Sequence, residues 1–496
     1  MTRSGDGSDR GAGGVGASVD TVSGTPASRL MRGVGAHGFL TAVRLVEQVL
    51  SVPVLLLAWG VETYGEWLML TAFTAYFVLT DLGFTSAASN EIARRAAAGE
   101  ESGARGLFVA TTRAFGRVSL GVVALAALLV AATPVAGTLG LERISGAEAK
   151  IILILMLLNA AVQQNRLMLT AGYRARGAYH RAMTIVGGVA ALRVGAMLAA
   201  VGLLGFQPVH AAMLIAAFMA VELAAMLAGL RRMALPRPSL FARRPGGEER
   251  LRPYLLMGAD FMLLPLTQAV VLQGTLILVG VLLGPAAAAV YGAHRTLARL
   301  GYQVSQLFAM SLRAEAGLLT GAADKDNMRR LTLRATQAAT WLALAIAVGQ
   351  LLVGRHVFEV WTQGRVDWRP DVFALLLAAT VAQAVWETTA ALRLGANRHK
   401  PITRGCLVIS LAGLGLAAAA MGPLGLVGAA GPALLAETAI VVLTVAVTLP
   451  VLEIGIGTWM RQVLTPPLWL LDVAAARLRR ARRPAAGSDG TEEGRE

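Results

Sequence analysis

Apolar residues along this chain gather in stretches long enough to cross a membrane, and short arginine-rich segments separate one stretch from the next. About 20 apolar residues cross the hydrocarbon core of a bilayer as an α-helix. Lipid offers no hydrogen bonds to the backbone, so a spanning helix must satisfy its own N–H and C=O groups. The pattern predicts an all-α polytopic membrane protein with twelve spans, close to residues 36–58, 67–88, 114–134, 150–171, 183–203, 209–230, 254–283, 287–311, 332–353, 371–392, 402–421 and 427–450.

Composition agrees with this reading and excludes other classes of protein. Of the 496 residues, 55% are hydrophobic and 15% are charged, and the mean hydropathy is +0.60. A soluble domain carries about 25% charged residues, so a soluble multidomain enzyme and a disordered protein are excluded. The one cysteine, Cys406, permits no internal disulfide. The preference for arginine over lysine, together with abundant alanine, indicates a bacterial source.

The formal net charge of +15 follows from topology. Loops on the cytoplasmic side of a membrane protein collect Lys and Arg. With the N-terminus inside, 35 Lys and Arg residues lie in cytoplasmic segments and 5 in external loops. This ratio predicts a multi-pass protein of the bacterial inner membrane with both termini cytoplasmic, and it accounts for the charge without nucleic acid as a partner.

Twelve spans divide into two halves of six, each beginning on the cytoplasmic side. The dipeptides Tyr64-Gly65 and Tyr291-Gly292 recur 227 residues apart, near the start of the second and eighth spans. Such an arrangement predicts two six-helix bundles related by a parallel repeat. The predicted segments are a disordered cytoplasmic tail 1–33, an N-terminal bundle 34–231, a basic linker 232–252, a C-terminal bundle 253–452 and a basic cytoplasmic tail 453–496.

The motifs of enzymes fail their context tests. Residues 33–38 spell GxGxxG, but a membrane span follows and no strand precedes them, so dinucleotide binding is excluded. The chain has no phosphate-binding GxxxxGK[ST] loop, and its six histidines lack the spacing of metal ligands. The predicted external loops are short. We therefore expect no catalytic residues, no metal and no cofactor.

Polar side chains inside the predicted spans are the candidate functional residues. A charged side chain at mid-membrane costs roughly 2.5–3.5 kcal/mol, so it is expected to face a cavity or a partner. Helical spacing forms one polar stripe in the first span and another in the eighth. The first stripe contains His37, Thr41, Arg44, Gln48 and Ser51, and the second contains Arg295, Arg299, Tyr302, Gln306 and Arg313.

Each candidate has a structural alternative. Arg44 is three residues from Glu47, which is the spacing of an ion pair on one helix. Glu47, Asp81 in the second span and Asp260 in the seventh could couple transport to an ion or be structural. Arg295 and Arg299 repel each other across one helical turn, and a bound anion would resolve that repulsion. Two lone charges, Arg166 and Arg193, are expected to be structural or interfacial, whereas three further acids are possible ion sites: Glu222, Glu387 and Glu437.

The third and eleventh spans have almost no polar atoms, which predicts that they face lipid. Spans 1, 2, 7 and 8 carry the polar stripes instead. We expect these four to line a wet cavity between the halves.

Two segments and one tryptophan resemble features of a known family. The stretch YGEWLMLTAFTAYFVLTDLGFTSAASNEIARRAAAGE at 64–100 resembles the second span and following cytoplasmic helix of the polysaccharide biosynthesis family, the Wzx-type flippases of lipid-linked oligosaccharides. The stretch LLGPAAAAVYGAHRTLARL at 282–300 resembles the start of that family's second half, and Trp361 is a third match. The family belongs to the multidrug/oligosaccharidyl-lipid/polysaccharide (MOP) exporter superfamily.

The resemblance implies a MATE-like fold and a role in cell-surface polysaccharide biosynthesis, such as lipopolysaccharide or exopolysaccharide. The implied substrate is an undecaprenyl-pyrophosphate-linked oligosaccharide, exported by alternating access. Polymerases and glycosyltransferases of the same pathway are possible partners beside membrane lipids. The predicted pyrophosphate and sugar cavity comprises Arg44, Gln48, Arg295, Arg299, Tyr302 and Gln306. Two alternatives stay open, a multidrug or cation antiporter of the same fold and a membrane glycosyltransferase or polymerase.

Overall fold

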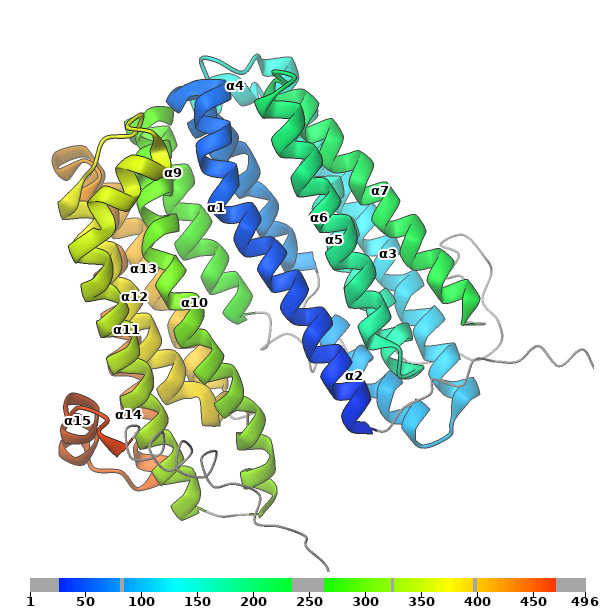
Figure 1. Ribbon diagram of the computed structural model, residues 1–496, viewed down its shortest axis with the longest axis vertical. Coiled ribbons are helices and arrows are strands. Elements are labelled where there is room, and N and C mark those ends of the chain that lie inside the picture. Colours follow the sequence, from blue (N-terminus) through cyan, green and yellow to red (C-terminus); the bar gives the residue numbers. More distant parts are fainter. Residues whose placement is uncertain (1–25, 81–83, 234–262, 323–324, 396–398, 470–496) are drawn as a thin grey trace, which may run out of the picture.

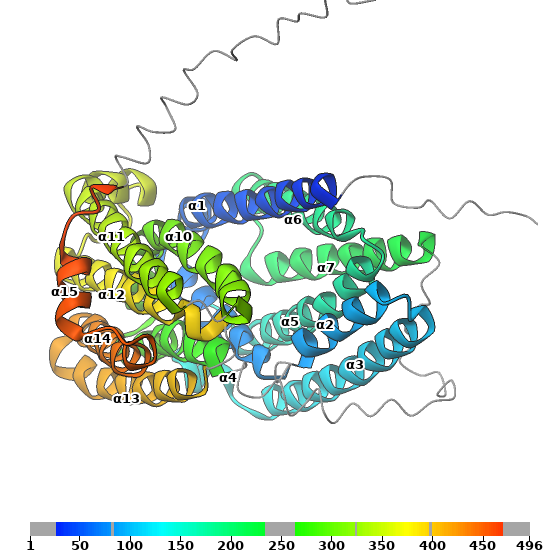
Figure 2. The ribbon, with the colours of Figure 1, turned by 90° about the horizontal axis from the view of Figure 1, so that it is seen from below.

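The computed structural model describes residues 26–80, 84–233, 263–322, 325–395 and 399–469. This part of the chain is nearly all helical and contains no strand, which confirms the predicted class. The helices form two bundles that stand side by side (Figures 1 and 2).

The N-terminal bundle is built from the first half of the chain. Its elements are α1 (Pro26–Ala72), η1 (Phe73–Thr80), α2 (Phe84–Ala97), α3 (Glu101–Ala132), α4 (Val135–Leu139), α5 (Gly146–Ala175), α6 (Tyr179–Gly202) and α7 (Pro208–Arg232). Gly60 interrupts α1 with a φ of 77°. Because a side chain strongly disfavours this region of φ, glycine allows the chain to reverse here and form two antiparallel spans.

The C-terminal bundle repeats this plan. A helical span Leu263–Leu283 contains the π turn η2 (Val270–Gly274) and α9 (Thr275–Leu283). Gly284, with a φ of 93°, then reverses the chain as Gly60 does. The remaining elements are α10 (Pro285–Ala322), α11 (Lys325–Thr362), α12 (Pro370–Gly395), α13 (Lys400–Leu424), α14 (Val427–Thr448), η3 (Pro450–Leu452) and α15 (Ile456–Leu464).

Ten helical segments of the described chain are long and apolar enough to cross a membrane. The segment Gly38–Phe77 contains the reversal at Gly60, so it supplies two spans. Helix α10 is absent from the ten, and it carries Arg295 and Arg299 in place of apolar residues, yet it runs the length of its bundle (Figure 1). These two adjustments account for the twelve predicted spans.

The third and eleventh predicted spans, α3 and α13, lie where the sequence predicts. Large apolar side chains project from their outer faces, and such exposure over a whole helix is what lipid requires. The exposed side chains include Val118, Leu125 and Leu128 on α3 and Val408, Leu411 and Leu424 on α13.

Helix α1 packs against α9, α10 and α11, so predicted spans 1, 2, 7 and 8 do meet at the junction of the two bundles. We refer to the two ends of the molecule as the α4 end and the α2 end. The bundles approach each other at the α4 end and diverge toward the α2 end, where α15 also lies (Figure 1).

Glycines allow the close approach of the bundles at the α4 end. A Cβ atom on Gly65 would lie 1.8 Å from the carbonyl oxygen of Pro285. A Cβ on Gly280 would lie 2.2 Å from the Met69 sulfur. The glycine of Tyr64-Gly65 is therefore required where α1 meets the start of α10.

A buried carboxylate fixes the loop that follows α4. Glu66 is fully buried and accepts backbone N–H bonds from Glu142, Arg143 and Ile144 at 2.6 to 2.8 Å. Three such bonds satisfy a carboxylate that burial would otherwise destabilise. The α4 end of the N-terminal bundle is thereby closed by an ordered loop.

Two segments predicted as tails are partly helical. Helix α1 already begins at Pro26, inside the predicted tail 1–33. Helix α15 and the residues up to Trp469 are ordered, inside the predicted tail 453–496. The linker 232–252 lies almost entirely outside the described residues.

Candidate functional site

A pocket of about 410 Å³, including its open mouth, surrounds Arg295 and Arg299 inside the C-terminal bundle. It lies among the π turn η2 and helices α10, α12 and α14, rather than between the two bundles as the polar stripes predict. Its lining residues are Val271, Leu272, Tyr291, Arg295, Ala298, Arg299, Leu376, Ala379, Thr380, Gln383, Ala433 and Glu437.

The π turn explains the position of Arg295. A π turn widens the helix and disturbs the normal pairing of backbone carbonyls with amides four residues later. Arg295 Nη1 donates to the Leu272 carbonyl in this turn. The guanidinium also lies 5.9 Å from the centroid of the Tyr291 ring. Arg295 therefore lines the pocket together with its own backbone and aromatic partners, Leu272 and Tyr291.

Arg299 lies one turn farther along α10. Its Nη1 donates to Gln383 Oε1 on α12 at 3.1 Å, and its guanidinium is 4.8 Å from the centroid of the Tyr302 ring. Among the described residues, neither Arg295 nor Arg299 has a carboxylate within 4 Å. Both cations thus have neutral hydrogen-bond and aromatic partners rather than a direct ion pair.

Two buried acids lie close to these arginines. The Tyr302 hydroxyl donates to Glu387 Oε1 at 2.5 Å, and Gln383 Nε2 contacts the same oxygen at 3.3 Å. The other oxygen, Oε2, has no hydrogen-bond partner in the described structure. Glu437 Oε2 accepts from Trp386 Nε1 at 2.7 Å.

These acids change the interpretation of the arginine pair. Sequence spacing suggests that only a bound anion relieves the repulsion between Arg295 and Arg299, because α10 offers no carboxylate nearby. The fold brings Glu387 from α12 and Glu437 from α14 into their neighbourhood, so two formal positive charges face two formal negative charges. A bound anion is therefore compatible with this site but is not needed to neutralise it.

The N-terminal bundle holds a second charged cluster, around Arg44. Arg193 on α6 pairs with Glu47 on α1 at 2.9 Å, and Arg166 on α5 pairs with Glu222 on α7 at 3.2 Å. The alternative of an Arg44–Glu47 pair is thus wrong, and Arg166 and Arg193 are not lone charges. Each arginine finds its acid on a neighbouring helix.

Arg44 forms no ion pair with the described acids of this cluster. It is close enough to the four paired groups to interact with them electrostatically, yet no carboxylate of the described residues lies within 4 Å of it. Its side chain is exposed. The N-terminal cluster therefore carries one formal positive charge that the described residues do not balance.

Gln48 separates Arg44 from the C-terminal pocket. Gln303 Nε2 on α10 donates to Gln48 Oε1 at 2.9 Å, a hydrogen bond between the two bundles. Arg44 is one turn from Gln48 toward the α2 end, and Arg299 is one turn from Gln303 toward the α4 end. Trp361 Nε1 adds a second link to the Val49 carbonyl at 2.6 Å.

The predicted site residues thus fall into three places rather than one. Arg44 and Glu47 lie in the N-terminal cluster, Gln48 lies at the junction, and Arg295, Arg299 and Tyr302 lie in the C-terminal bundle.

The prediction omits Gln383 and Thr380, although Thr380, Gln383 and Glu387 form a stripe with spacings of three and four on α12. The side chain of Gln306 and the residues Asp81 and Asp260 lie outside the described part of the structure.

Within the described ranges, no three His, Cys, Asp or Glu side chains come together as metal ligands. His294 is instead held by its neighbours, with Nδ1 2.8 Å from the Val290 carbonyl and Nε2 accepting from the Arg369 backbone N–H at 2.9 Å.

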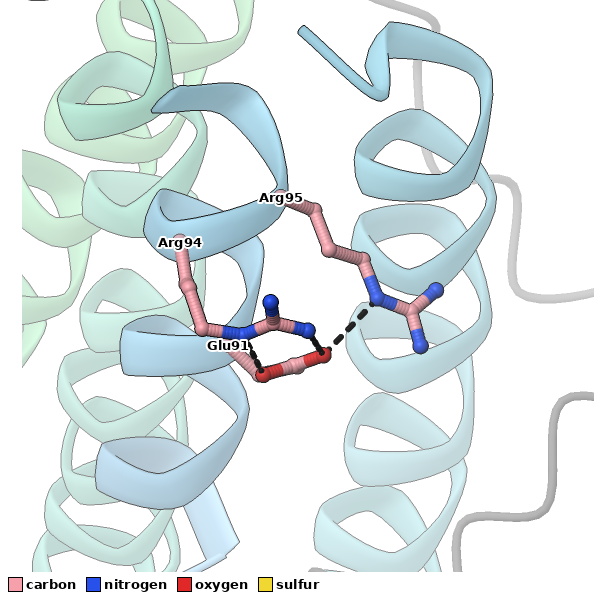
Figure 3. Close-up of polar contacts among 3 residues, drawn as sticks. All are labelled: Glu91, Arg94 and Arg95. Atoms are coloured by element: carbon pink, nitrogen blue, oxygen red, sulfur yellow. Dashed lines mark hydrogen bonds and ion pairs between the residues drawn. The ribbon is translucent and has the colours of Figure 1, made fainter. Parts of the chain in front are cut away.

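A charged triad stabilises the amphipathic helix at the α2 end. Glu91 on α2 accepts two bonds from Arg94, at 2.7 and 2.8 Å, and one from Arg95 at 2.9 Å (Figure 3). The hydrogen bonds from Arg94, aided by those from Arg95, lower the pKa of the Glu91 carboxyl to about 2, against the opposing effect of partial burial.

The triad predicts that the folded protein becomes less stable as the pH falls. Because the pKa of Glu91 is lower in the folded state, its contribution is complete above pH 4.5 and disappears as the pH falls toward 2. We expect the melting temperature of the wild-type protein to fall more between pH 5 and pH 3 than that of Glu91→Gln, by on the order of a degree. Thermal melts of both proteins in detergent, at pH 5 and at pH 3, measure this difference. Equal falls in both proteins would contradict the prediction, and high salt should reduce the difference.

Comparison with known proteins identifies the fold. No family model and no curated protein matches the chain. Among solved structures, it is similar to an inward-facing conformation of a multidrug resistance MATE family transporter of the MOP superfamily. That match has a TM-score of 0.68 and 16% identity, over 85% of this chain and 98% of the other. An outward-facing conformation of a transporter of the same description matches with a TM-score of 0.53 and 17% identity, over 87% and 96% of the two chains.

A third similar structure comes from another transporter. It is a MOP superfamily transporter from Pyrococcus furiosus, described as having a binding pocket of reverse polarity that suggests a different function. Its TM-score is 0.57, with 16% identity over 88% of this chain and 98% of that one. The chain therefore has the MATE/MOP fold of these transporters. The ten described helical segments that are long and apolar enough to cross a membrane agree with a multi-pass protein of that fold.

Proposed function

We propose that this protein is a flippase that exports a lipid-linked oligosaccharide, with an undecaprenyl pyrophosphate headgroup, across the bacterial inner membrane. In this proposal the α2 end is cytoplasmic. The α2 end carries Arg94, Arg95, Arg231 and Arg232 on the described helices, as expected for cytoplasmic segments. Both termini then lie on the cytoplasmic side.

The observation that carries the proposal is the unbalanced charge of Arg44. Arg193 and Arg166 are neutralised by Glu47 and Glu222, whereas Arg44 is exposed and has no acid within 4 Å among the described residues. An isolated guanidinium attracts a phosphate through charge-assisted hydrogen bonds and repels a cation. The N-terminal cluster thus suits a phosphorylated headgroup better than a cationic drug.

The shape of the molecule suits capture from the cytoplasm. The bundles diverge toward the α2 end (Figure 1), and the higher TM-score belongs to an inward-facing transporter. Arg44 lies on the α2 side of the Gln48–Gln303 bond, so a headgroup arriving from the cytoplasm would meet it first. The lipid tail would remain in the bilayer while the headgroup moves.

Passage then requires the junction to open. In our mechanism the Gln48–Gln303 bond breaks as the bundles rock, and the headgroup moves toward Arg299 and Arg295 on the α4 side. An inside-negative membrane potential favours the outward movement of two negative charges by roughly 4.6 kcal/mol per 100 mV. The membrane potential could therefore drive export without a coupling ion.

Reconstitution tests this function. We expect proteoliposomes containing the protein to move a fluorescently labelled lipid-linked oligosaccharide between leaflets at least about tenfold faster than protein-free vesicles. A membrane-impermeant quencher measures the labelled headgroup on the outer surface. A rate equal to that of protein-free vesicles, from a preparation that is monodisperse in detergent, would contradict the proposal.

The multidrug or cation antiporter remains the second candidate because of one feature. Glu387 is buried with an unpartnered oxygen, and Glu437 lines a pocket that also contains Tyr291. Buried acids beside aromatic rings suit a proton-coupled cation site. Uptake of a cationic dye that depends on Glu387 and a pH gradient, without movement of the lipid-linked sugar, would favour this candidate.

A further inference from the structure

Helix α15 (Ile456–Leu464) has a broad apolar face, and the C-terminal bundle covers only part of it. Trp459 and Val463 are buried in a cluster with residues of α12, α14 and η3. Next to them on the helix circumference, a row of large apolar side chains is exposed: Ile456, Met460 and Leu464 on α15, continued by Leu468. The opposite face is polar, with Thr458, Arg461 and Gln462.

The segment is fixed to α11 by hydrogen bonds rather than loosely attached. Gln337 on α11 is almost fully buried, and its Nε2 donates to the Thr465 carbonyl at 2.9 Å. Its Oε1 accepts from Gln462 Nε2 at 2.8 Å and from Trp469 Nε1 at 2.9 Å. Trp341 Nε1 donates to the Val463 carbonyl at 3.1 Å. The exposed row is therefore held in one orientation.

The attachment lies where α11 changes from charged to apolar. One turn below Gln337, Arg334 is exposed and lies 5.5 Å from the centroid of the Trp469 ring. Two turns above it, the lipid-facing side chains of α11 begin with Leu344 and continue with Val348 and Leu352. Three tryptophans, Trp341, Trp459 and Trp469, also gather at this level.

We infer that residues 455–469 form an in-plane anchor that lies in the phospholipid headgroup and acyl boundary of the leaflet at the α2 end. The exposed apolar row continues the lipid-facing surface of α11, and the polar face is directed away from it. Tryptophans concentrate at such boundaries, and an amphipathic helix binds there with its apolar face in the acyl region. The exposed arginines Arg334 and Arg461 match the phosphates of anionic lipids.

A lipid surface fits this row better than a second copy of the chain. A stable protein interface buries about 800 Å² on each partner and draws on about 20 residues. The exposed row contains four large apolar side chains, which is too few for such an interface. The anchor would hold the C-terminal bundle at a fixed depth, because it is bonded to α11.

Fluorescence depth measurements test the anchor. In a Cys406→Ala background, the single variants Met460→Cys and Leu464→Cys, with Thr458→Cys as control, are labelled with an environment-sensitive fluorophore. The full chain is reconstituted in phosphatidylcholine vesicles containing phosphatidylglycerol. We expect labels at 460 and 464 to emit at shorter wavelength than at 458. They should also be quenched at least about threefold more by nitroxide-bearing lipid than by aqueous iodide, with the reverse at 458.

Two results would overturn the inference. Labels at 460 and 464 that behave as the control does would place the row in water. Labels shielded from both quenchers, increasingly so at higher protein-to-lipid ratio, would place a second protein copy on it. Elution at the wild-type volume in detergent establishes that each variant is folded, and Ile456→Cys gives the same readout should one position fail this test.

Discussion

Replacement of Arg44 by glutamine is expected to lower the rate of headgroup translocation by about 10- to 100-fold. A hydrogen bond to a charged group contributes about 1.5–3 kcal/mol, and each 1.4 kcal/mol is a tenfold change. The loss should be large because Arg44 is the one cation of the N-terminal cluster that no described acid balances within 4 Å. Initial rates of labelled lipid movement in proteoliposomes, compared between Arg44→Gln and the wild type, measure this loss.

The control for this prediction keeps the net charge of the cluster unchanged. The double variant Glu47→Gln with Arg193→Gln removes an ion pair of 2.9 Å but leaves Arg44 in place. We expect its rate to stay within about threefold of wild type, since the headgroup would still meet one unbalanced guanidinium. A double variant as inactive as Arg44→Gln would show that the cluster is structural and that Arg44 has no separate role.

Gly65→Ala is expected to abolish the close contact of the bundles at the α4 end. The added Cβ would lie 1.8 Å from the Pro285 carbonyl oxygen, and a backbone atom cannot rotate away as a side chain can. Overpacking of this kind costs about 1–3 kcal/mol, enough to shift a two-state equilibrium by about 5- to 150-fold. The conformation closed at the α4 end should lose population, and transport should fall at least about tenfold.

Distances between spin labels measure this shift directly. Thr138 on α4 and Gln363 after α11 are exposed positions on different bundles. In the Cys406→Ala background, labels at these positions should move apart in Gly65→Ala. Gly188→Ala is the matched control, because a Cβ there meets nothing within 4 Å. An unchanged distance distribution in Gly65→Ala, or an equal change in Gly188→Ala, would contradict the proposed closure.

The sequence predicts the architecture well because its signals are local. Apolar length, loop charge and the spacing of polar residues identify the spans, the lipid-facing helices α3 and α13, and the helices that meet at the junction. The predicted spans 36–58 and 67–88 are separated in the structure by the reversal at Gly60, although the helix is otherwise continuous. The predicted span 287–311 falls on α10, whose Arg295 and Arg299 keep it below the hydropathy of the other spans.

The site is predicted less well because a stripe gives the face of a helix but not its neighbour. Glu47 is three residues from Arg44, yet the fold places Arg193 of α6 against it. The partner of Arg295 is the backbone carbonyl of Leu272, which lies in a π turn that the residue pattern does not predict. Pairings between distant elements depend on packing, which a single sequence does not display.

Two features had signals that could have revealed them. Thr380, Gln383 and Glu387 form a polar stripe on α12 and join the pocket region around Arg299. Ile456, Met460 and Leu464 are spaced four residues apart, the period of an amphipathic helix, and Pro466 and Pro467 follow. The predicted tail beginning at 453 therefore contained a helix signal.

Binding of an undecaprenyl pyrophosphate headgroup to the purified protein tests the central claim most directly. We predict that the wild-type protein binds a fluorescent lipid pyrophosphate in a salt-dependent manner. The double variant Arg44→Gln with Arg299→Gln should bind it at least about 100-fold more weakly, while still eluting at the wild-type volume in detergent. Equal binding by both proteins, or binding of a cationic dye but no pyrophosphate by the wild type, would contradict a cationic site for phosphorylated headgroups.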